Sequence, residues 1–235
     1  MKALILVGGE GSRLKPFTEN IPKVLVSIKE NKTFLEYVFD WLKSQGITNI
    51  VLLTGHFAEK IEQYCGDGSK FGLRIEYTGI HEVLGTAGQL KPAKKFIDST
   101  FILLNGDSIF TIDLKKLIEF HQLNKAKMTI ALKHIENTKE YGLVHTNNQG
   151  KIIKFTEKGN LVSGVNTING GVYVLEPELF DLIPAGKVSL EKEILPKINQ
   201  LYGLEFTNYF IDIGTPKNYD KFKKDAIQFN MEDFK

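Results

Sequence analysis

The residues with the clearest chemistry lie near the N-terminus. Five apolar residues at 3–7 run directly into Gly8-Gly9-Glu10-Gly11-Ser12-Arg13-Leu14, and Lys23 follows after Pro22. Glycines at the end of a strand let the backbone turn sharply and approach a ligand closely. The loop offers unpaired N–H groups, and a guanidinium and an ammonium group accompany them. This combination is typical of a site that binds a chain of phosphates.

Two common phosphate-binding loops do not match this segment. A P-loop requires Gly-Lys followed by Ser or Thr, which the sequence does not contain. The dinucleotide-binding fingerprint matches at Gly9 and Gly11, but Leu14 occupies the position of its third glycine. The second strand ends in Thr54-Gly55 and lacks the acidic residue that this fingerprint requires. A dinucleotide-dependent dehydrogenase is therefore excluded. The plain alternative is a glycine-rich turn with Arg13 and Lys23 in solvent.

A first candidate metal ligand is Asp107, which follows the apolar strand at 101–104. Ligands of open α/β sheets bind outside the carboxyl ends of the strands, so Asp107 falls on the same edge as the glycine loop. A carboxylate beside a triphosphate is repelled unless a divalent cation lies between them, which predicts Mg²⁺. The alternative is a turn aspartate that caps the next helix, although Asp113 is better placed for that.

A second candidate ligand is Asp212, which stands between two isoleucines just before a helix that Pro216 opens. Such a position indicates a defined role rather than a casual surface charge. Two carboxylates from distant segments can share one Mg²⁺. The alternative is a structural anion at the N-terminus of the helix.

The elements that must position these residues alternate through the first half of the chain. The hydrophobic pattern predicts strands at 3–7, 49–53, 73–77 and 101–104 and helices at 33–45, 57–64 and 86–96. This order predicts an α/β fold, a Rossmann-like three-layer αβα sandwich with a mostly parallel central sheet. The second half predicts a smaller antiparallel part, with strands at 128–132, 142–145, 151–155 and 172–175 and a final helix from 216 to about 230.

Composition is consistent with one large domain of this class. The chain has 235 residues, of which 42% are hydrophobic, and a net charge of +2. This charge gives no reason to expect nucleic acid or an acidic membrane surface as a partner. The sequence shows neither an apolar run long enough to cross a bilayer nor a signal segment, so a cytoplasmic protein is expected.

The loop followed by Pro22-Lys23 resembles the signature of the sugar-nucleotide pyrophosphorylases, nucleotidyltransferases that join a nucleoside triphosphate to a sugar 1-phosphate and release pyrophosphate. Further segments resemble the family in the same order, at 84–88, 140–144, 155–158, 168–173 and 209–216. The resemblance implies a single nucleotidyltransferase domain with a glycosyltransferase-A-like fold. Within it, 1–125 would mainly bind the nucleotide, 126–215 would mainly bind the sugar phosphate, and 216–235 would form a C-terminal helix.

The resemblance also implies roles for individual residues. The nucleotide would be bound by Leu6, Gly8, Gly9, Gly11, Ser12, Arg13, Lys23, Gly85 and Thr86. The sugar phosphate would be bound by Asn105, Gly142, Glu157, Lys158 and Asn169. Arg13, Lys23 and Asp107 would be catalytic, and Asp107 and Asp212 would hold Mg²⁺. From the residues alone, Thr86 is also a helix N-cap, Glu157-Lys158 a solvated pair and Asn169 a turn or bulge residue. Gly159 departs from the proline that is common in the family.

The segments at 104–110, 169–173 and 209–214 look most like those of D-glycero-D-manno-heptose 1-phosphate guanylyltransferases. This implies GTP and a heptose 1-phosphate as substrates and GDP-heptose, a precursor of surface polysaccharide, as product. Guanylyl transfer to mannose 1-phosphate is the first alternative, and uridylyl or thymidylyl transfer to a hexose 1-phosphate the second. A non-catalytic sugar-nucleotide sensor is the alternative of another class. The aromatic C-terminal helix packs on its own core or on a second subunit, so a homodimer stays open.

Overall fold

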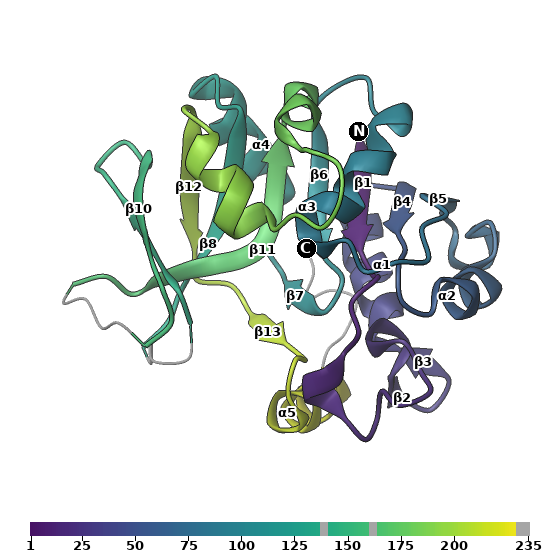
Figure 1. Cartoon of the computed structure of the whole chain (residues 1–235). Coiled ribbons are helices and arrows are strands. Elements are labelled where there is room, and N and C mark those ends of the chain that lie inside the picture. Colours follow the sequence, from purple (N-terminus) through teal and green to yellow (C-terminus); the bar gives the residue numbers. More distant parts are fainter. Residues whose placement is uncertain (137–140, 160–163, 229–235) are drawn as a thin grey trace.

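The computed structural model describes the chain except residues 137–140, 160–163 and 229–235 (Figure 1). Its main sheet has nine strands, in the order β10-β9-β11-β6-β1-β4-β5, with β8 beside β11 and β12 beside β8 in the described part of the chain. The strands are β1 (Lys2–Leu6), β4 (Asn49–Leu53), β5 (Arg74–Tyr77), β6 (Phe101–Asn105), β8 (Met128–His134), β9 (Leu143–Thr146), β10 (Ile152–Thr156), β11 (Thr167–Leu175) and β12 (Leu201–Phe206).

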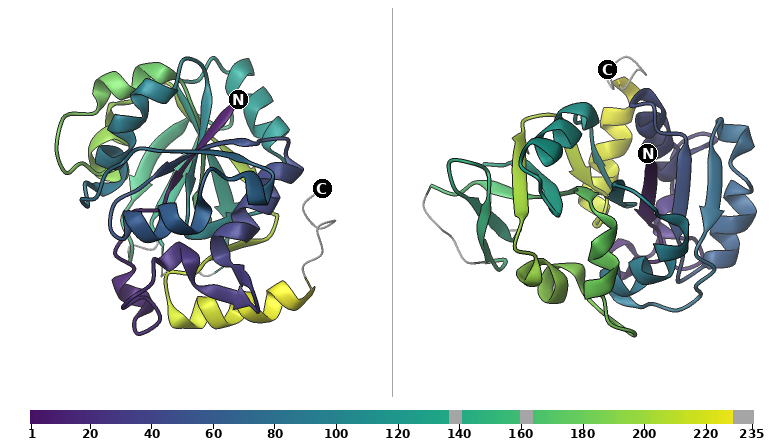
Figure 2. Two further views of the ribbon diagram at one scale, coloured as in Figure 1. Left: turned by 90° about the vertical axis from the view of Figure 1, so that its right-hand side faces the viewer. Right: turned by 90° about the horizontal axis from the view of Figure 1, so that it is seen from above.

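The centre of the sheet is parallel and covered on both faces. Strand β1 pairs in parallel with β4 and β6, and β4 with β5. Side chains of a strand alternate between faces, so Ala3 and Ile5 enter one core while Leu4 enters the other. Residues of α1 (Phe34–Ser44), α2 (Ala58–Cys65) and α4 (Leu114–Leu123) join the first core. Those of α3 (Gly85–Leu90) and the 3₁₀ helix η4 (Lys91–Phe96) join the second. The predicted three-layer sandwich is confirmed (Figure 2).

The second half is mainly antiparallel, as predicted, although β12, a strand that was not predicted, pairs in parallel with β8. Strand β11 pairs antiparallel with β6, β8 and β9, and β9 pairs antiparallel with β10. The hairpin β9–β10 projects from one side of the molecule (Figure 1). Helix α5 (Pro216–Gln228) packs on α1 through the rings of Phe222 and Phe34, whose centroids lie 5.1 Å apart. The predicted end of this helix, at residue 230, lies outside the described residues.

One break in a helix and two pairings of short strands were not predicted. The helix expected over 86–96 divides into α3 and η4, because Pro92 lacks the N–H that a continuous helix requires. Strands β2 (Ser27–Lys29) and β3 (Lys32–Thr33) form a small ribbon. Strands β7 (Ser108–Phe110) and β13 (Phe210–Asp212) pair antiparallel and connect the two halves of the chain. None of the described helices is long and apolar enough to cross a membrane.

A buried histidine makes the stability of the fold depend on pH. His121 on α4 is 1% exposed and lies 2.9 Å from the Thr129 hydroxyl and 3.0 Å from the Glu176 carboxylate. Burial lowers the pKa of His121, although Glu176 opposes the shift. The unfolded chain therefore takes up this proton at a higher pH than the folded protein does. We expect the free energy of unfolding to be largest above the ordinary histidine pKa and to fall as the pH drops through it.

The variant His121→Asn tests this expectation. It should be less stable than the wild type at pH ~8 by roughly 1–3 kcal/mol, because the shorter side chain cannot keep the hydrogen bonds to both the buried Thr129 and the partly buried Glu176. Its stability should also change less between pH ~8 and pH ~5, since the titrating group is gone. Urea unfolding across this range measures both effects. The exposed His81 provides the control His81→Asn, which should keep the wild-type profile. An equally steep profile in His121→Asn would contradict the assignment.

Candidate active site

The glycine loop and the first aspartate meet at one edge of the sheet because β1 and β6 are parallel neighbours. Leu6 pairs with Asn105 at the ends of these strands, and the Gly106 N–H donates to the Leu6 carbonyl at 3.0 Å. Asp107 follows directly. The pairing of β13 with β7 places Asp212 opposite Ser108, next to Asp107. Residues more than a hundred positions apart thus reach one point.

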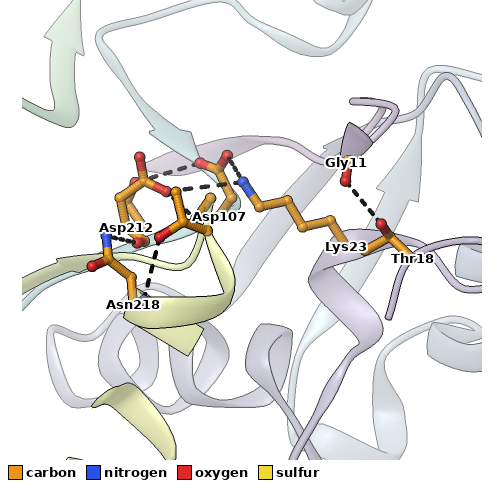
Figure 3. A network of polar contacts seen from close by, with 9 residues as sticks. Gly11, Thr18, Lys23, Asp107, Asp212 and Asn218 are labelled. Atoms are coloured by element: carbon orange, nitrogen blue, oxygen red, sulfur yellow. Dashed lines mark hydrogen bonds and ion pairs between the residues drawn. The ribbon is translucent and has the colours of Figure 1, made fainter. Parts of the chain in front are cut away.

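Lys23 and the two aspartates form a compact charged cluster (Figure 3). The Lys23 Nζ lies 2.7 Å from Asp107 Oδ2 and 3.9 Å from Asp212 Oδ1, and the Lys23 side chain is only 10% exposed. The Asn218 amide donates to the Asp212 backbone carbonyl at 2.8 Å, and the Gly214 N–H donates to its carboxylate. Asp212 is therefore held in place at the start of α5.

The surroundings of Asp212 act on its pKa in two opposing directions. Burial raises it above the ordinary aspartate value, and the nearby charge of Asp107 raises it further. The charges of Lys23 and Arg13 and the Gly214 hydrogen bond act in the opposite direction. Two carboxylates that repel each other in a partly buried site are stabilised by any additional positive charge.

The Arg13 side chain reaches the same cluster from the glycine loop. A Cβ added to Gly214 would lie 2.9 Å from Arg13 Nη2 and 3.3 Å from Lys23 Nζ, so both cationic groups contact this backbone position. The loop itself is fixed by Gly11, whose φ is 66° and whose carbonyl accepts a hydrogen bond from the Thr18 hydroxyl at 2.8 Å (Figure 3). Arg13 and Ser12 remain exposed.

The donor set fits Mg²⁺. This ion prefers oxygen ligands and is commonly held by one or two carboxylates together with substrate phosphates. Asp107 and Asp212 supply the two carboxylates, and the described residues contain no larger group of acidic, histidine or cysteine side chains that would form a closed metal cage. The pair is thus suited to a metal that is completed by a phosphate ligand.

A cavity of about 220 Å³ opens beside this cluster. The predicted residues that line it are Leu6, Gly9, Lys23, Gly85, Thr86, Asn105 and Asp107. Sequence reasoning missed Val7, Val24, Val83 and Gln89. Of these, Gln89 carried a signal in the sequence, since it is a polar residue that directly follows the family-like segment at 84–88.

Four predicted nucleotide-binding residues, Gly8, Gly11, Ser12 and Arg13, do not line this cavity. Gly8 is buried, and its carbonyl accepts from the His56 N–H and the Gln89 amide, both at 3.2 Å. The structure gives Gly8 a packing role in the loop rather than an exposed surface. Thr86 does not cap its own helix: its hydroxyl is used in contacts with Leu190 and Glu191.

Adjacent glycines in the loop should respond differently to alanine. A Cβ at Gly8 would lie 2.5 Å from Gln89 Nε2 and 2.7 Å from Gly55 N, whereas a Cβ at Gly9 meets no atom within 4 Å. We expect Gly8→Ala to lower the free energy of unfolding by about 1–3 kcal/mol through overpacking. Gly9→Ala should stay within about 0.5 kcal/mol of the wild type. Urea unfolding of both variants measures the difference, and equal stabilities would contradict the close packing at Gly8.

A second cavity of about 560 Å³ lies between the β9–β10 hairpin and the turn η7 (Leu190–Ile194). Among the predicted sugar-phosphate residues, Gly142, Glu157 and Asn169 line it, whereas Asn105 lines the first cavity. Lys158 is exposed and lines neither. Sequence reasoning missed Glu191 and Lys192. Glu140, at the start of one family-like segment, lies outside the described residues.

Local backbone geometry shapes this second cavity. The register of β11 against β8 shifts between Asn169 and Tyr173, so the Asn-Gly-Gly sequence, expected to form a turn or bulge, interrupts regular pairing here. The Asn169 amide donates to the Tyr173 hydroxyl at 2.9 Å, and its oxygen accepts from Gly171 N–H at 2.9 Å. Gly159 has a φ of 89°, which proline cannot adopt. The loop after Glu157-Lys158 therefore takes a path that a proline at this position would not allow.

The chain is similar to known proteins over nearly its whole length. A family model described as nucleotidyl transferase matches residues 2–228. A D-glycero-alpha-D-manno-heptose 1-phosphate guanylyltransferase of Aneurinibacillus thermoaerophilus is 40% identical, over 97% of this chain and 100% of the relative. A mannose-1-phosphate guanyltransferase of Yarrowia lipolytica is 38% identical, over 93% of this chain and 62% of the relative. A crystal structure of HddC from Yersinia pseudotuberculosis complexed with GMP-PN has a TM-score of 0.84 at 32% identity, covering 96% of this chain and 99% of that one.

Proposed function

Because this chain belongs to the nucleotidyl transferase family, we propose that it transfers a guanylyl group from GTP to D-glycero-α-D-manno-heptose 1-phosphate, forming GDP-heptose and pyrophosphate. The observation that carries the proposal is the cluster of Lys23, Asp107 and Asp212 beside the first cavity. Relatives that match almost the whole chain support heptose as the sugar. The family match supports treating 1–235 as one domain with a nucleotide half and a sugar-phosphate half.

The reaction needs two polyanions to be brought together. A phosphate oxygen of the sugar 1-phosphate attacks the α-phosphorus of GTP, and the bond from that phosphorus to the pyrophosphate oxygen breaks. A phosphate monoester is already an adequate nucleophile, so no general base is required. Catalysis then depends on positioning and on compensation of negative charge.

The cationic groups divide this work in the proposed mechanism. Arg13, exposed in the glycine loop, holds the β- and γ-phosphates. Lys23 stabilises the charge that develops on the α-phosphoryl group, and Gly9 and Ser12 offer backbone donors near it. Asp107 and Asp212 would hold Mg²⁺, which would compensate negative charge on the phosphate oxygens. The sugar phosphate occupies the second cavity beside Glu157 and Asn169, with Lys158 at its phosphate. The use of a nucleoside triphosphate supports a cytoplasmic location.

A substrate panel tests the proposal. GTP, UTP, dTTP and ATP are each combined with heptose 1-phosphate, mannose 1-phosphate and glucose 1-phosphate, and pyrophosphate release is measured with Mg²⁺. We expect the largest kcat/KM for GTP with heptose 1-phosphate. Preference for mannose 1-phosphate would favour the second candidate, which the match to mannose-1-phosphate guanyltransferases supports. No pyrophosphate from any pair, together with binding of a sugar nucleotide, would favour a non-catalytic sensor.

A further inference from the structure

The two cavities share a wall that is built from distant parts of the chain. The N–H groups of Ala87 and Gly88 donate to the Val188 carbonyl at 3.0 and 3.2 Å, and the Val188 N–H donates to the Leu84 carbonyl at 2.8 Å. The loop that begins α3, on the nucleotide side, is thus joined to the segment that leads into η7. These backbone hydrogen bonds fix the position of η7 relative to the first cavity.

The contact is close enough to require glycine at two positions. Gly85 has a φ of 71°, and a Cβ there would lie 2.6 Å from the Val188 carbonyl oxygen. At Gly88, a Cβ would lie 2.5 Å from the Gly186 carbonyl oxygen. Backbone atoms cannot move aside as a flexible side chain does. The two segments therefore behave as one unit.

Thr86 connects the two sides of this wall. Its hydroxyl accepts from the Leu190 N–H at 2.8 Å and donates to Glu191 Oε2 at 3.0 Å. The Ser189 hydroxyl donates to the same Oε2 at 3.1 Å. Thr86 lines the first cavity and Glu191 lines the second. Two hydroxyls thus hold a carboxylate at the border between them.

The remaining oxygen of Glu191 is available to a ligand. Both hydrogen bonds that the described residues give to this carboxylate fall on Oε2, so Oε1 keeps its capacity to accept. A carboxylate repels a phosphate group but accepts readily from sugar hydroxyls. Because the two hydroxyls already orient this side chain, binding a ligand costs little further conformational entropy.

Resting on the proposed function, we propose that Glu191 accepts a hydrogen bond from a ring hydroxyl of the acceptor sugar and helps select that sugar. Thr86 is the positioning residue that orients it. Glu191 lies on the single π-type turn η7, which Thr86 contacts through the Leu190 N–H and the Glu191 carboxylate. Glu191 then lies opposite the hairpin that carries Glu157, so that the sugar ring contacts carboxylates from both walls.

The variant Glu191→Gln tests this assignment. Its amide oxygen would keep the hydrogen bonds from Thr86 and Ser189, which turns the NH₂ group, a donor, toward the sugar. With D-glycero-α-D-manno-heptose 1-phosphate as probe, KM for the sugar phosphate should rise by roughly 10- to 100-fold. KM for GTP should stay within about 2-fold of the wild type, since the hydrogen bonds of Thr86 are preserved. Glu193→Gln is the control, because Glu193 lies on the same turn but lines neither cavity.

Monodeoxy derivatives of the same heptose 1-phosphate separate sugar contact from a structural role. One derivative, lacking the hydroxyl that Glu191 binds, should give the same KM with the wild type and with Glu191→Gln. An equal penalty for every derivative, or an unchanged sugar KM, would overturn the inference. Should Glu191→Gln fail to fold in a thermal unfolding scan, Glu191→Asp is measured in the same way. Absence of pyrophosphate release by the wild type would overturn the proposed function instead.

Discussion

Replacing Lys23 by alanine is expected to lower kcat by about 10²–10³-fold while the chain stays folded. The Lys23 side chain is 10% exposed and its ammonium lies 2.7 Å from Asp107, so it is positioned before any substrate binds. Removing a fixed positive charge from a site where negative charge develops typically lowers kcat on this scale. Single-turnover and steady-state pyrophosphate release measure the loss, and a thermal unfolding scan checks that the fold is intact.

The loss of Lys23 should also change how strongly activity depends on Mg²⁺. Without Lys23, compensation of the two carboxylates depends on Arg13 and the metal, so the requirement for Mg²⁺ should become stronger. Lys29→Ala, on the neighbouring strand β2, removes an equivalent charge away from the cavity and serves as the control. A kcat of Lys23→Ala close to that of the wild type would remove Lys23 from the catalytic machinery.

Replacing Asp107 by asparagine is expected to abolish Mg²⁺-dependent turnover, with a loss of about 10³-fold or more in kcat. The amide keeps the shape of the side chain but removes the charge that a divalent cation requires. The same change also removes the negative charge that lies 2.7 Å from the Lys23 ammonium, so this ion pair is lost. Activity is measured as pyrophosphate release at increasing Mg²⁺ concentrations. A sample with excess chelator gives the rate without metal. Mn²⁺ binding in the presence of GTP, followed by electron paramagnetic resonance, reports the metal directly.

A matched control for this variant exists on the next helix. Asp113 caps α4, where its carboxylate accepts from the N–H groups of Lys115 and Lys116 at 3.0 and 3.3 Å. Asparagine is an equally good N-cap, so Asp113→Asn should leave both stability and metal dependence unchanged. If Asp107→Asn kept the wild-type metal requirement and Mn²⁺ affinity, Asp107 would not be a ligand.

The first half of the fold was predictable because its signals are local. The apolar run before Gly8 marks a strand with both faces buried, and the glycines after it mark the turn at its carboxyl end. Alternation of strands and helices then requires a parallel sheet, which places Asp107 on the edge where the glycine loop ends. Neither conclusion needs a contact between distant residues to be known in advance.

Asp212 was already a candidate from the sequence, but only the tertiary structure shows how distant residues come together at the site. Asp212 reaches Asp107 only because β13 pairs with β7, and Glu191 meets Thr86 across 105 positions of sequence. Short strands and single turns are too short to show a hydrophobic period in the sequence. Their partners are determined by burial and by the backbone groups that still need hydrogen bonds elsewhere in the fold. The sequence therefore determined the strand ends and the glycine loop. Only long-range packing determined how the second carboxylate and the wall between the two cavities were assembled around them.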